Sequence, residues 1–277
     1  MLYRFLHLVT VGTSIIRNAS FHESVEAGVR ERLAKWSMAP PHSGEDVEAG
    51  NRAVPSSKEF REVLGFVSGS PRRASAELNA FIGYLERLVS RGIDGVSHYL
   101  VLFGSDTGAG WFSTRILEEY LGSLVGQDLS RTWGVRGHFI GGVEAYRVRG
   151  LGVNFQDGIL NLLGKVKKIV ISMGKGYDRV LANLTGGFKP ESAAILVVAG
   201  MLGIDTVYYI HEAMREVAEI PVIPLTIEPN AKKILENALE NNIGGAEQKL
   251  LEKLGLPLTG KKLTPWSKKL LETLLYP

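Results

Sequence analysis

Three turns rich in glycine, serine and threonine each follow an apolar stretch and precede a helical pattern. They are Val11-Gly12-Thr13-Ser14, then Gly104-Ser105-Asp106-Thr107-Gly108-Ala109-Gly110, then Asn183-Leu184-Thr185-Gly186-Gly187-Phe188-Lys189-Pro190. Glycines let the backbone approach a ligand closely, free amides at a helix start point at phosphate oxygens, and hydroxyls add donors. Lys189 supplies one mobile positive charge. The turns therefore predict a site for a ligand that carries phosphate groups.

The familiar nucleotide-binding motifs do not occur. The sequence contains no G-x-x-x-x-G-K-[ST] phosphate loop, and no G-x-G-x-x-G follows the first apolar stretch. An ordinary nucleotide triphosphatase or a dinucleotide dehydrogenase is therefore disfavoured. Glycines and hydroxyls also cap helices in any α/β domain, which is the better interpretation of one such turn taken alone. Three turns of this kind, one of them with a lysine, favour the ligand site.

Metal ligands and reactive thiols have little support. The six histidines stand at positions 7, 22, 42, 98, 138 and 211, and no two are spaced i, i+2 or i, i+4. The absence of cysteine excludes disulfides, thiolate zinc sites, iron–sulfur clusters and a cysteine nucleophile. We therefore expect no metal and no cofactor. His211-Glu212 is either a catalytic dyad or, as its place directly after a strand favours, a brace for the loop or a dimer contact.

Short β-rich apolar runs and helical patterns alternate along the chain. The runs are Leu6 to Val11, Tyr99 to Phe103, Lys168 to Ser172 and Thr206 to Ile210, and the helical patterns cover 20–36, 74–91, 114–125, 176–181 and 191–202. This alternation predicts an α/β fold with a Rossmann-like, doubly wound, mostly parallel sheet. In such a sheet the turns at the carboxyl ends of the strands form the ligand crevice, so the three turns are expected to meet.

Two segments depart from this rhythm. Residues 37–58 form a turn-rich insertion, which is either a lid or a disordered loop. After residue 227 the composition changes, and residues 228–277 hold eight lysines, six glutamates and no arginine or histidine. Helical patterns there at 230–241, 245–254 and 265–275 predict a small helical appendage. The chain is thus divided into a Rossmann-like domain at 1–227 and a C-terminal helical region at 228–277.

The overall composition narrows the class of protein. In 277 residues, 32 Lys and Arg stand against 29 Asp and Glu, a formal net charge of +3, which argues against a protein that coats long nucleic acid. Hydrophobic residues make up 45% and charged residues 22%, as in soluble globular domains. The longest uncharged apolar stretch, 193–204, is shorter than the roughly 18 to 20 residues of a membrane span. We expect no membrane segment, no signal peptide and a cytoplasmic protein.

The turns together resemble a known family. The combination of Val11-Gly12-Thr13-Ser14, Ser105-Asp106-Thr107, Asn183-Leu184-Thr185-Gly186-Gly187-Phe188-Lys189 and Tyr208-Tyr209-Ile210-His211-Glu212 is similar to the CRISPR-associated Rossmann-fold (CARF) domain. More narrowly it resembles the archaeal ring nucleases of type III CRISPR systems. The resemblance runs from about residue 3 to 227, and its most specific part is the Thr-Gly-Gly-Phe-Lys element.

The resemblance implies a homodimer with one pocket for a cyclic oligoadenylate across its two-fold axis. Ring nucleases of this kind cut cyclic tetra-adenylate without metal, and their catalytic pair corresponds to Ser14 and Lys189. In RNA the 2′-hydroxyl beside the phosphate is a built-in nucleophile, so positioning and charge stabilisation suffice for cleavage. Contacts to the ligand are expected from Gly12, Thr13, Arg17, Asn18, Ser105, Asp106, Thr107, Thr185, Gly186, Gly187 and Phe188.

Alternatives remain for several residues and for the function. For Arg17 and Asn18 a solvated helix start is an equal interpretation, and for most other arginines a solvated surface is the better one. Arg17 and His22 match the R-x4-H pattern of HEPN ribonucleases, but that motif belongs on a C-terminal helical domain and is disfavoured here. The alternative function is a non-catalytic CARF sensor that acts through its C-terminal helices. A Rossmann-like enzyme for a different nucleotide is a weaker third.

Overall fold

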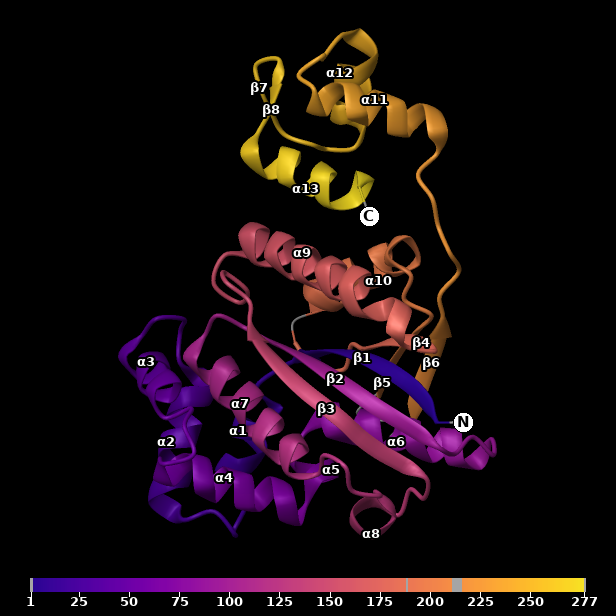
Figure 1. The fold of residues 1–277 in the computed structure, drawn as a ribbon. Helices are drawn as coiled ribbons and strands as arrows, with labels where there is room; N and C mark the ends of the chain where they lie inside the picture. Colours follow the sequence, from indigo (N-terminus) through magenta and orange to yellow (C-terminus); the bar gives the residue numbers. More distant parts are fainter. Residues whose placement is uncertain (1, 188, 211–215, 277) are drawn as a thin grey trace.

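A six-stranded sheet forms the centre of the molecule (Figure 1). In the computed structural model, which describes residues 2–187, 189–210 and 216–276, its strand order is β3-β2-β1-β4-β5-β6. The first five strands run parallel, and β6 pairs antiparallel with β5. The predicted α/β fold with a mostly parallel, Rossmann-like sheet is confirmed. The strands are β1 (Tyr3–Val11), β2 (Val96–Gly104), β3 (His138–Arg147), β4 (Arg179–Asn183), β5 (Thr206–Ile210) and β6 (Val217–Pro221).

Helices cover both faces of the sheet, as Figure 1 shows. One face carries α9 (Phe155–Met173), which runs into the short 3-10 turn Gly174–Gly176, and α10 (Lys189–Leu202). The other face carries α1 (Ser14–Ser20), α2 (Ala27–Met38), α3 (Gly44–Asn51), α4 (Lys58–Gly69), α5 (Pro71–Ala74), α6 (Ala76–Ser90), α7 (Gly108–Ser123) and α8 (Ser130–Trp133).

The sheet therefore separates two apolar cores. Along β1, Phe5 and Val9 point into the core beneath α6 and α7, whereas Leu6 and Leu8 point into the core beneath α9 and α10. This alternation follows from the two-residue period of a strand. Because β1 is buried on both sides, it reads as a nearly continuous apolar run, which is why the sequence located it correctly.

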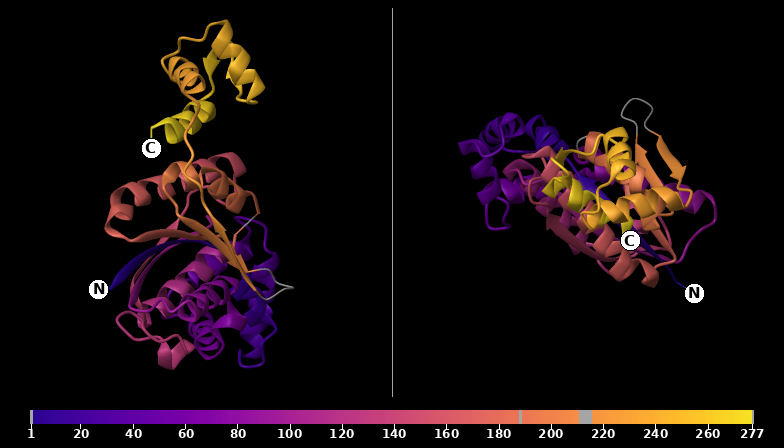
Figure 2. Two further views of the ribbon diagram at one scale, coloured as in Figure 1. Left: turned by 90° about the vertical axis from the view of Figure 1, so that its right-hand side faces the viewer. Right: turned by 90° about the horizontal axis from the view of Figure 1, so that it is seen from above.

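The C-terminal region is a separate small cluster of helices (Figure 2). It contains α11 (Pro229–Leu239), α12 (Gly245–Lys253), the two-stranded ribbon β7 (Leu258–Thr259) and β8 (Lys262–Leu263), and α13 (Pro265–Leu275). Leu235, Leu251 and Leu271 form its own apolar core. The region contacts the rest of the chain through α13 and α9, where the Lys167 ammonium donates to the carbonyl oxygens of Glu272 and Thr273 at 3.3 and 3.0 Å. The predicted helical appendage is confirmed.

Two predicted elements are wrong. The run Lys168 to Ser172 lies inside α9 and is not a strand. Its β-branched residues suggested a strand, but Leu162, Val166 and Ile169 recur at helical spacing and are all buried. The pattern at 176–181 is not a helix, because the chain enters β4 at Arg179. In each case tertiary burial overrides local propensity.

Other elements were not predicted from the sequence. The strand β3 contains Gly141 and Gly142 and alternates poorly, so its pattern did not indicate a strand. The helical pattern at 20–36 is divided between α1 and α2. Residues 37–58 contain the ordered helix α3, which packs against α7. No helix in the described ranges is long and apolar enough to cross a membrane.

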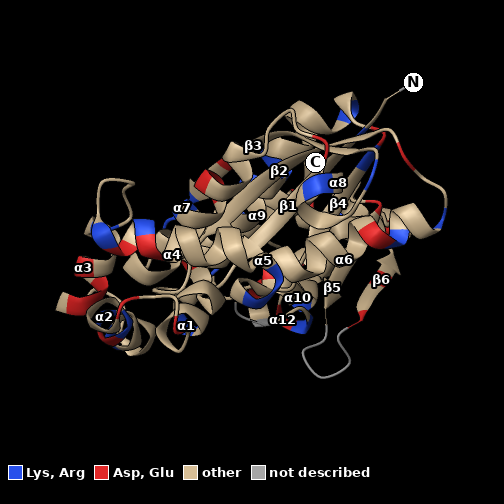
Figure 3. Cartoon of the chain, turned by 90° about the horizontal axis from the view of Figure 1, so that it is seen from below, with Lys and Arg blue, Asp and Glu red and all other residues tan. Residues whose placement is uncertain are grey.

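Charges of both signs alternate over the helical face seen from below (Figure 3). Several of them pair across elements: Arg72 bridges to Glu86, and Arg91 bridges to Glu219 of β6 at 2.9 Å. The second pair connects the end of α6 to the antiparallel edge strand. Such exposed pairs contribute little to stability individually.

Candidate functional site

The chain places β2 and β3 on one side of β1 and then places β4, β5 and β6 on the other side. In open α/β sheets, ligands bind where the order changes in this way, here at the carboxyl ends of β1 and β4. The turns after these two strands touch. A Cβ atom on Gly12 would lie 2.9 Å from the amide nitrogen of Gly187, so only glycine permits the approach. The Thr10 hydroxyl donates to the carbonyl oxygen of Gly186 at 2.6 Å. Gly187 itself has φ of 87°, a conformation that side-chain-bearing residues avoid.

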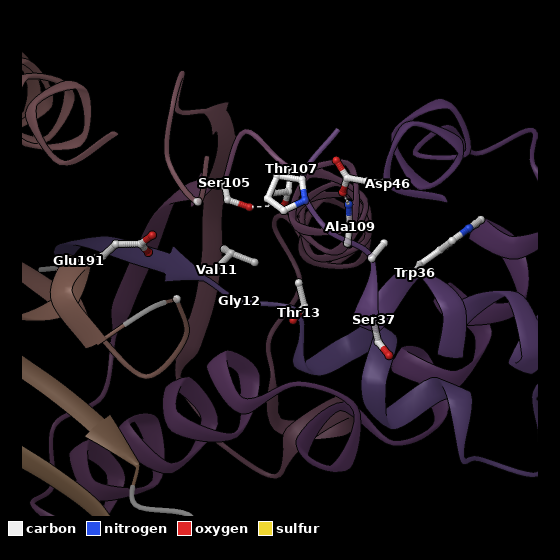
Figure 4. Close-up of a pocket in the computed structure, with 14 residues that line it drawn as sticks. Val11, Gly12, Thr13, Trp36, Ser37, Asp46, Ser105, Thr107, Ala109 and Glu191 are labelled. Atoms are coloured by element: carbon white, nitrogen blue, oxygen red, sulfur yellow. Dashed lines mark hydrogen bonds between the residues drawn. The ribbon is translucent and has the colours of Figure 1, made fainter. Parts of the chain in front are cut away.

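A pocket of about 210 Å³ opens at this point (Figure 4). All three predicted turns contribute to it, together with the end of α2, the segment that follows α2, and Gly152 in the loop before α9. Two of the lining side chains are the carboxylates of Asp46 and Glu191, and none of the described lining residues is a lysine or an arginine. The lining residues are Val11, Gly12, Thr13, Trp36, Ser37, Ala39, Pro41, Asp46, Ser105, Thr107, Ala109, Gly152, Gly187 and Glu191.

Ser14 is the first residue of α1 and lies beside a buried carboxylate. Its hydroxyl donates to Oε2 of Glu77 at 3.2 Å, and its oxygen accepts from the amide of Ala76 at 3.2 Å. Glu77, near the start of α6, is only 2% exposed. It also accepts from the amide of Gly12 at 2.8 Å and from the hydroxyl of Ser75 at 2.6 Å. The first turn is therefore organised around Glu77, a residue that the sequence did not single out.

A backbone amide of the second turn also donates to a carboxylate from a different helix. Thr107 caps α7 by accepting from the amide of Gly110 at 3.1 Å. The neighbouring amide of Ala109 donates at 3.1 Å to Asp46, which comes from α3 and is 3% exposed. The sequence predicted free amides at the first and second turns. In the structure the amides of Gly12, Ala109 and Gly110 each have an internal acceptor instead.

Asp106 contacts the end of β3 and the loop that follows it. Its carboxylate pairs with the Arg147 guanidinium at 3.0 Å and accepts from the amide of Gly150 at 2.8 Å. These contacts fix the second turn to the loop that leaves β3. The hydroxyls of Ser105 and Thr107 share a hydrogen bond of 2.7 Å at the pocket wall (Figure 4). Arg147 is exposed, in keeping with the surface position favoured for most of these arginines, and it pairs there with Asp106.

The third turn is tied to the neighbouring strands. The Thr185 hydroxyl accepts from the amide of Ile210 at 3.2 Å, and the Asn183 side chain donates to the carbonyl oxygen of Glu77 at 3.0 Å. Glu191, on the first turn of α10, is buried beside Gly187. The backbone of Lys189 begins α10. Phe188 and the side chain of Lys189 lie outside the described residues, as does His211.

Arg17 and Asn18 lie on α1 behind the first turn. The Asn18 amide donates to the carbonyl oxygens of Arg73 and Ala74 at 2.9 and 3.1 Å, so it holds α5 in place. The Arg17 side chain is exposed. The His22 ring packs at a tilt against Phe66, and its ring nitrogen contacts the Ser24 hydroxyl at 2.8 Å. The match to the R-x4-H pattern therefore lies on the Rossmann-like domain, not on a C-terminal helical domain.

A row of buried histidines crosses the sheet beneath the site. The Tyr208 hydroxyl and His7 are 3.0 Å apart, and ring nitrogens then connect His7 to His98 and His98 to His138 at 2.9 Å each. The three histidines come from β1, β2 and β3. Burial lowers the pKa of His7 to about 3, and it also lowers the pKa values of His98 and His138. Burial raises the pKa of Tyr208, so all four groups are neutral at pH 7.

The sequence missed Glu77, Asp46 and Glu191. A weak signal existed for Glu77, because it follows Ser75 at the start of a helical pattern, as acidic residues often do. Nothing local indicated that Glu77 would contact Ser14, which is 63 positions away. In the part of the chain that the structure describes, no group of three or more His, Asp or Glu side chains could hold a metal ion.

A comparison with known families identifies a related family. The model of a family described as CRISPR-associated protein (Cas_APE2256) matches residues 72–223, which is more than half of the chain. The matched stretch begins before α6 and ends after β6, so it includes Glu77 and the second and third turns.

Proposed function

Because the chain belongs to this family of CRISPR-associated proteins, we propose that it is a ring nuclease that binds cyclic tetra-adenylate and cleaves it. The products are linear di-adenylates that end in a 2′,3′-cyclic phosphate, and loss of the ring switches off type III CRISPR signalling. The observation that carries the proposal is the contact between the turns after β1 and β4. This contact supports a shared role for Ser14 and for α10, which begins two residues after Gly187.

The proposed reaction uses a nucleophile that the substrate itself contains. The 2′-oxygen attacks the adjacent phosphorus, the bond from phosphorus to O5′ breaks, and a 2′,3′-cyclic phosphate forms. The proton lost by the 2′-hydroxyl is balanced by one gained at O5′. The protein then has two tasks, to hold the 2′-oxygen in line with the leaving O5′ and to stabilise the developing negative charge.

The residues of the site suit these tasks. Ser14 orients the 2′-hydroxyl from the first turn. Lys189 and the amides of Gly186 and Gly187 stabilise the negative phosphate oxygens from the third turn, where a helix begins. Ser105 and Thr107 add hydroxyls from the second turn, which also lines the pocket.

Pocket size supports a homodimeric site. The pocket of one chain measures about 210 Å³, which is below the roughly 300–1,000 Å³ of typical small-molecule sites. A ring of four nucleotides is larger than a typical small molecule. We therefore propose that two copies face each other across a two-fold axis and that each holds half of the ring. This arrangement supplies two Ser14 and Lys189 pairs, one for each cut.

A non-catalytic sensor is the second candidate function. The observation that favours it is a direct route from the pocket to the C-terminal region. Gly152 lines the pocket, α9 begins three residues later at Phe155, and α13 packs on α9. The Trp266 indole donates to the carbonyl oxygen of Gln156 at 3.3 Å, close to that start. A ligand that moves the start of α9 would therefore act on α13.

Incubation of the purified protein with radiolabelled cyclic tetra-adenylate in EDTA separates these functions. Appearance of di-adenylate with a 2′,3′-cyclic phosphate supports the ring nuclease. Retention of the intact ring on the protein supports the sensor. If the protein neither binds nor cleaves the ring, both functions are contradicted, and a different nucleotide is favoured as the ligand.

A further inference from the structure

The Glu77 carboxylate accepts several hydrogen bonds beside the turns that follow β1 and β4. Its carboxylate accepts from the Gly12 amide, the Ser14 hydroxyl and the Ser75 hydroxyl, at 2.8, 3.2 and 2.6 Å. Its backbone carbonyl accepts from the Asn183 side chain at 3.0 Å. Glu77 of α6 therefore contacts the chain at the carboxyl ends of both β1 and β4.

A buried carboxylate that connects two turns has a large desolvation cost. Removing a charge from water costs several kcal/mol unless hydrogen bonds compensate, and a neutral polar side chain would connect the same elements at lower cost. One backbone amide and two hydroxyls donate to Glu77. A carboxylate has no proton, so it can only accept hydrogen bonds from these groups. In each of these hydrogen bonds the Glu77 carboxylate is the acceptor and its partner is the donor.

This direction determines what the Ser14 oxygen can do. A hydroxyl has one proton and two lone pairs. The proton of Ser14 points at Glu77, and one lone pair accepts from the amide of Ala76 at 3.2 Å. One lone pair remains. Ser14, which is half-buried, can therefore accept a hydrogen bond from a ligand but has no proton to donate to it.

We propose that Glu77 is a positioning residue that fixes the Ser14 hydroxyl as an acceptor for the 2′-hydroxyl of the substrate. The inference rests on the proposed ring cleavage. An acceptor at Ser14 draws the 2′-proton away from phosphorus, so that a lone pair of the 2′-oxygen faces the phosphate. A serine that donated its proton instead would occupy that lone pair and oppose the attack.

Replacement of Glu77 by glutamine reverses the hydrogen bond. Glu77→Gln keeps the shape and leaves one oxygen for the Gly12 amide, but its NH₂ group faces Ser14 and must donate to it. The Ser14 proton is then released toward the ligand. We expect binding of cyclic tetra-adenylate within about threefold of wild type and single-turnover cleavage slower by about 10- to 100-fold. Glu86→Gln is the matched control, because Glu86 is exposed on the same helix.

Two further variants separate positioning from a merely structural role. Glu77→Asp keeps an acceptor-only carboxylate and is expected to cleave faster than Glu77→Gln, even if both are less stable than wild type. In a Ser14→Ala background, Glu77→Gln is expected to change cleavage by less than about twofold, because the residue through which it acts is gone.

The outcomes are distinct. If the wild-type protein fails to cleave the ring, the proposed function fails, and the role of Glu77 fails with it. If the wild type cleaves and Glu77→Gln cleaves equally fast, only the role of Glu77 is overturned. An equal loss from Glu77→Gln with and without Ser14, or an aspartate variant slower than the glutamine variant, would also overturn it.

Discussion

The Asp46 carboxylate accepts a hydrogen bond of 3.1 Å from the amide of Ala109, although the two residues belong to different helices and lie 63 positions apart. Its second oxygen accepts from the amide of His42 at 3.0 Å. Asp46 therefore attaches the segment 37–58 to the start of α7, where a helix N-terminus attracts negative charge. Because Asp46 also lines the pocket, it occupies a place suited to a phosphate group.

Neutralising this carboxylate should strengthen binding of the proposed ligand. Asp46→Asn keeps an acceptor for the Ala109 amide, gives up the acceptor for the His42 amide and removes a negative charge from the pocket wall, so repulsion of the phosphates decreases. We expect binding of cyclic tetra-adenylate to tighten about 3- to 10-fold at low salt, as measured by isothermal titration calorimetry. Glu45→Gln, an exposed neighbour on α3, should change nothing. Weaker binding in Asp46→Asn would show that the carboxylate itself contacts the ligand.

The buried histidine row predicts sensitivity of the fold to acid. The pKa of His7 is about 3 in the folded chain, whereas 6.5 is the ordinary value for histidine, so between these pH values the unfolded chain binds more protons. Stability is therefore fully present above pH 6.5 and falls as the pH decreases toward 3. At pH 5 the loss from His7 alone is about 2 kcal/mol.

Urea unfolding at pH 7.5 and at pH 5 measures this loss directly. His98 and His138 change the stability in the same direction, because burial lowers their pKa values too. An unfolding free energy that did not decrease between the two pH values would contradict the presence of a neutral, buried row.

The contact between the first and third turns predicts the effect of one added methyl group. Gly12→Ala would bring a Cβ to 2.9 Å from the Gly187 amide, and backbone on both sides leaves little room to adjust. We expect the third turn to shift and cleavage to slow by about 100-fold, because displacements near 1 Å have effects of this size. Gly65→Ala is the control: it meets nothing within 4 Å on α4 and should stabilise the helix by about 0.5–1 kcal/mol. Normal cleavage in Gly12→Ala would mean that the contact is dispensable.

The sequence predicted what is local and missed what depends on distant contacts. The turns at Gly12 and Gly186 were recognisable because glycine beside hydroxyl residues has a local conformational meaning. Glu77 and Asp46 were not recognisable, because their contacts to Gly12, Ser14 and Ala109 span more than 60 residues.

The errors in the fold have a similar origin. Around Ile169 the β-branched residues predicted a strand. The segment instead belongs to α9, which buries one of its faces along its length. The strand β3 was missed because Gly141 and Gly142 weaken its alternation. Its pairing with β2 extends from Val96 to Gly104, and that pairing defines it as a strand.

Single-turnover cleavage of radiolabelled cyclic tetra-adenylate in EDTA, by the wild type and by Lys189→Ala, tests the proposed site most directly. Loss of one charge-stabilising group should slow cleavage by about 10² to 10³ while the ring still binds. Lys175→Ala is the control, because this exposed lysine lies in the turn after α9. We predict that the wild type and Lys175→Ala cleave the ring at similar rates and that Lys189→Ala is slowed to this extent. Unchanged cleavage in Lys189→Ala would contradict the proposed site.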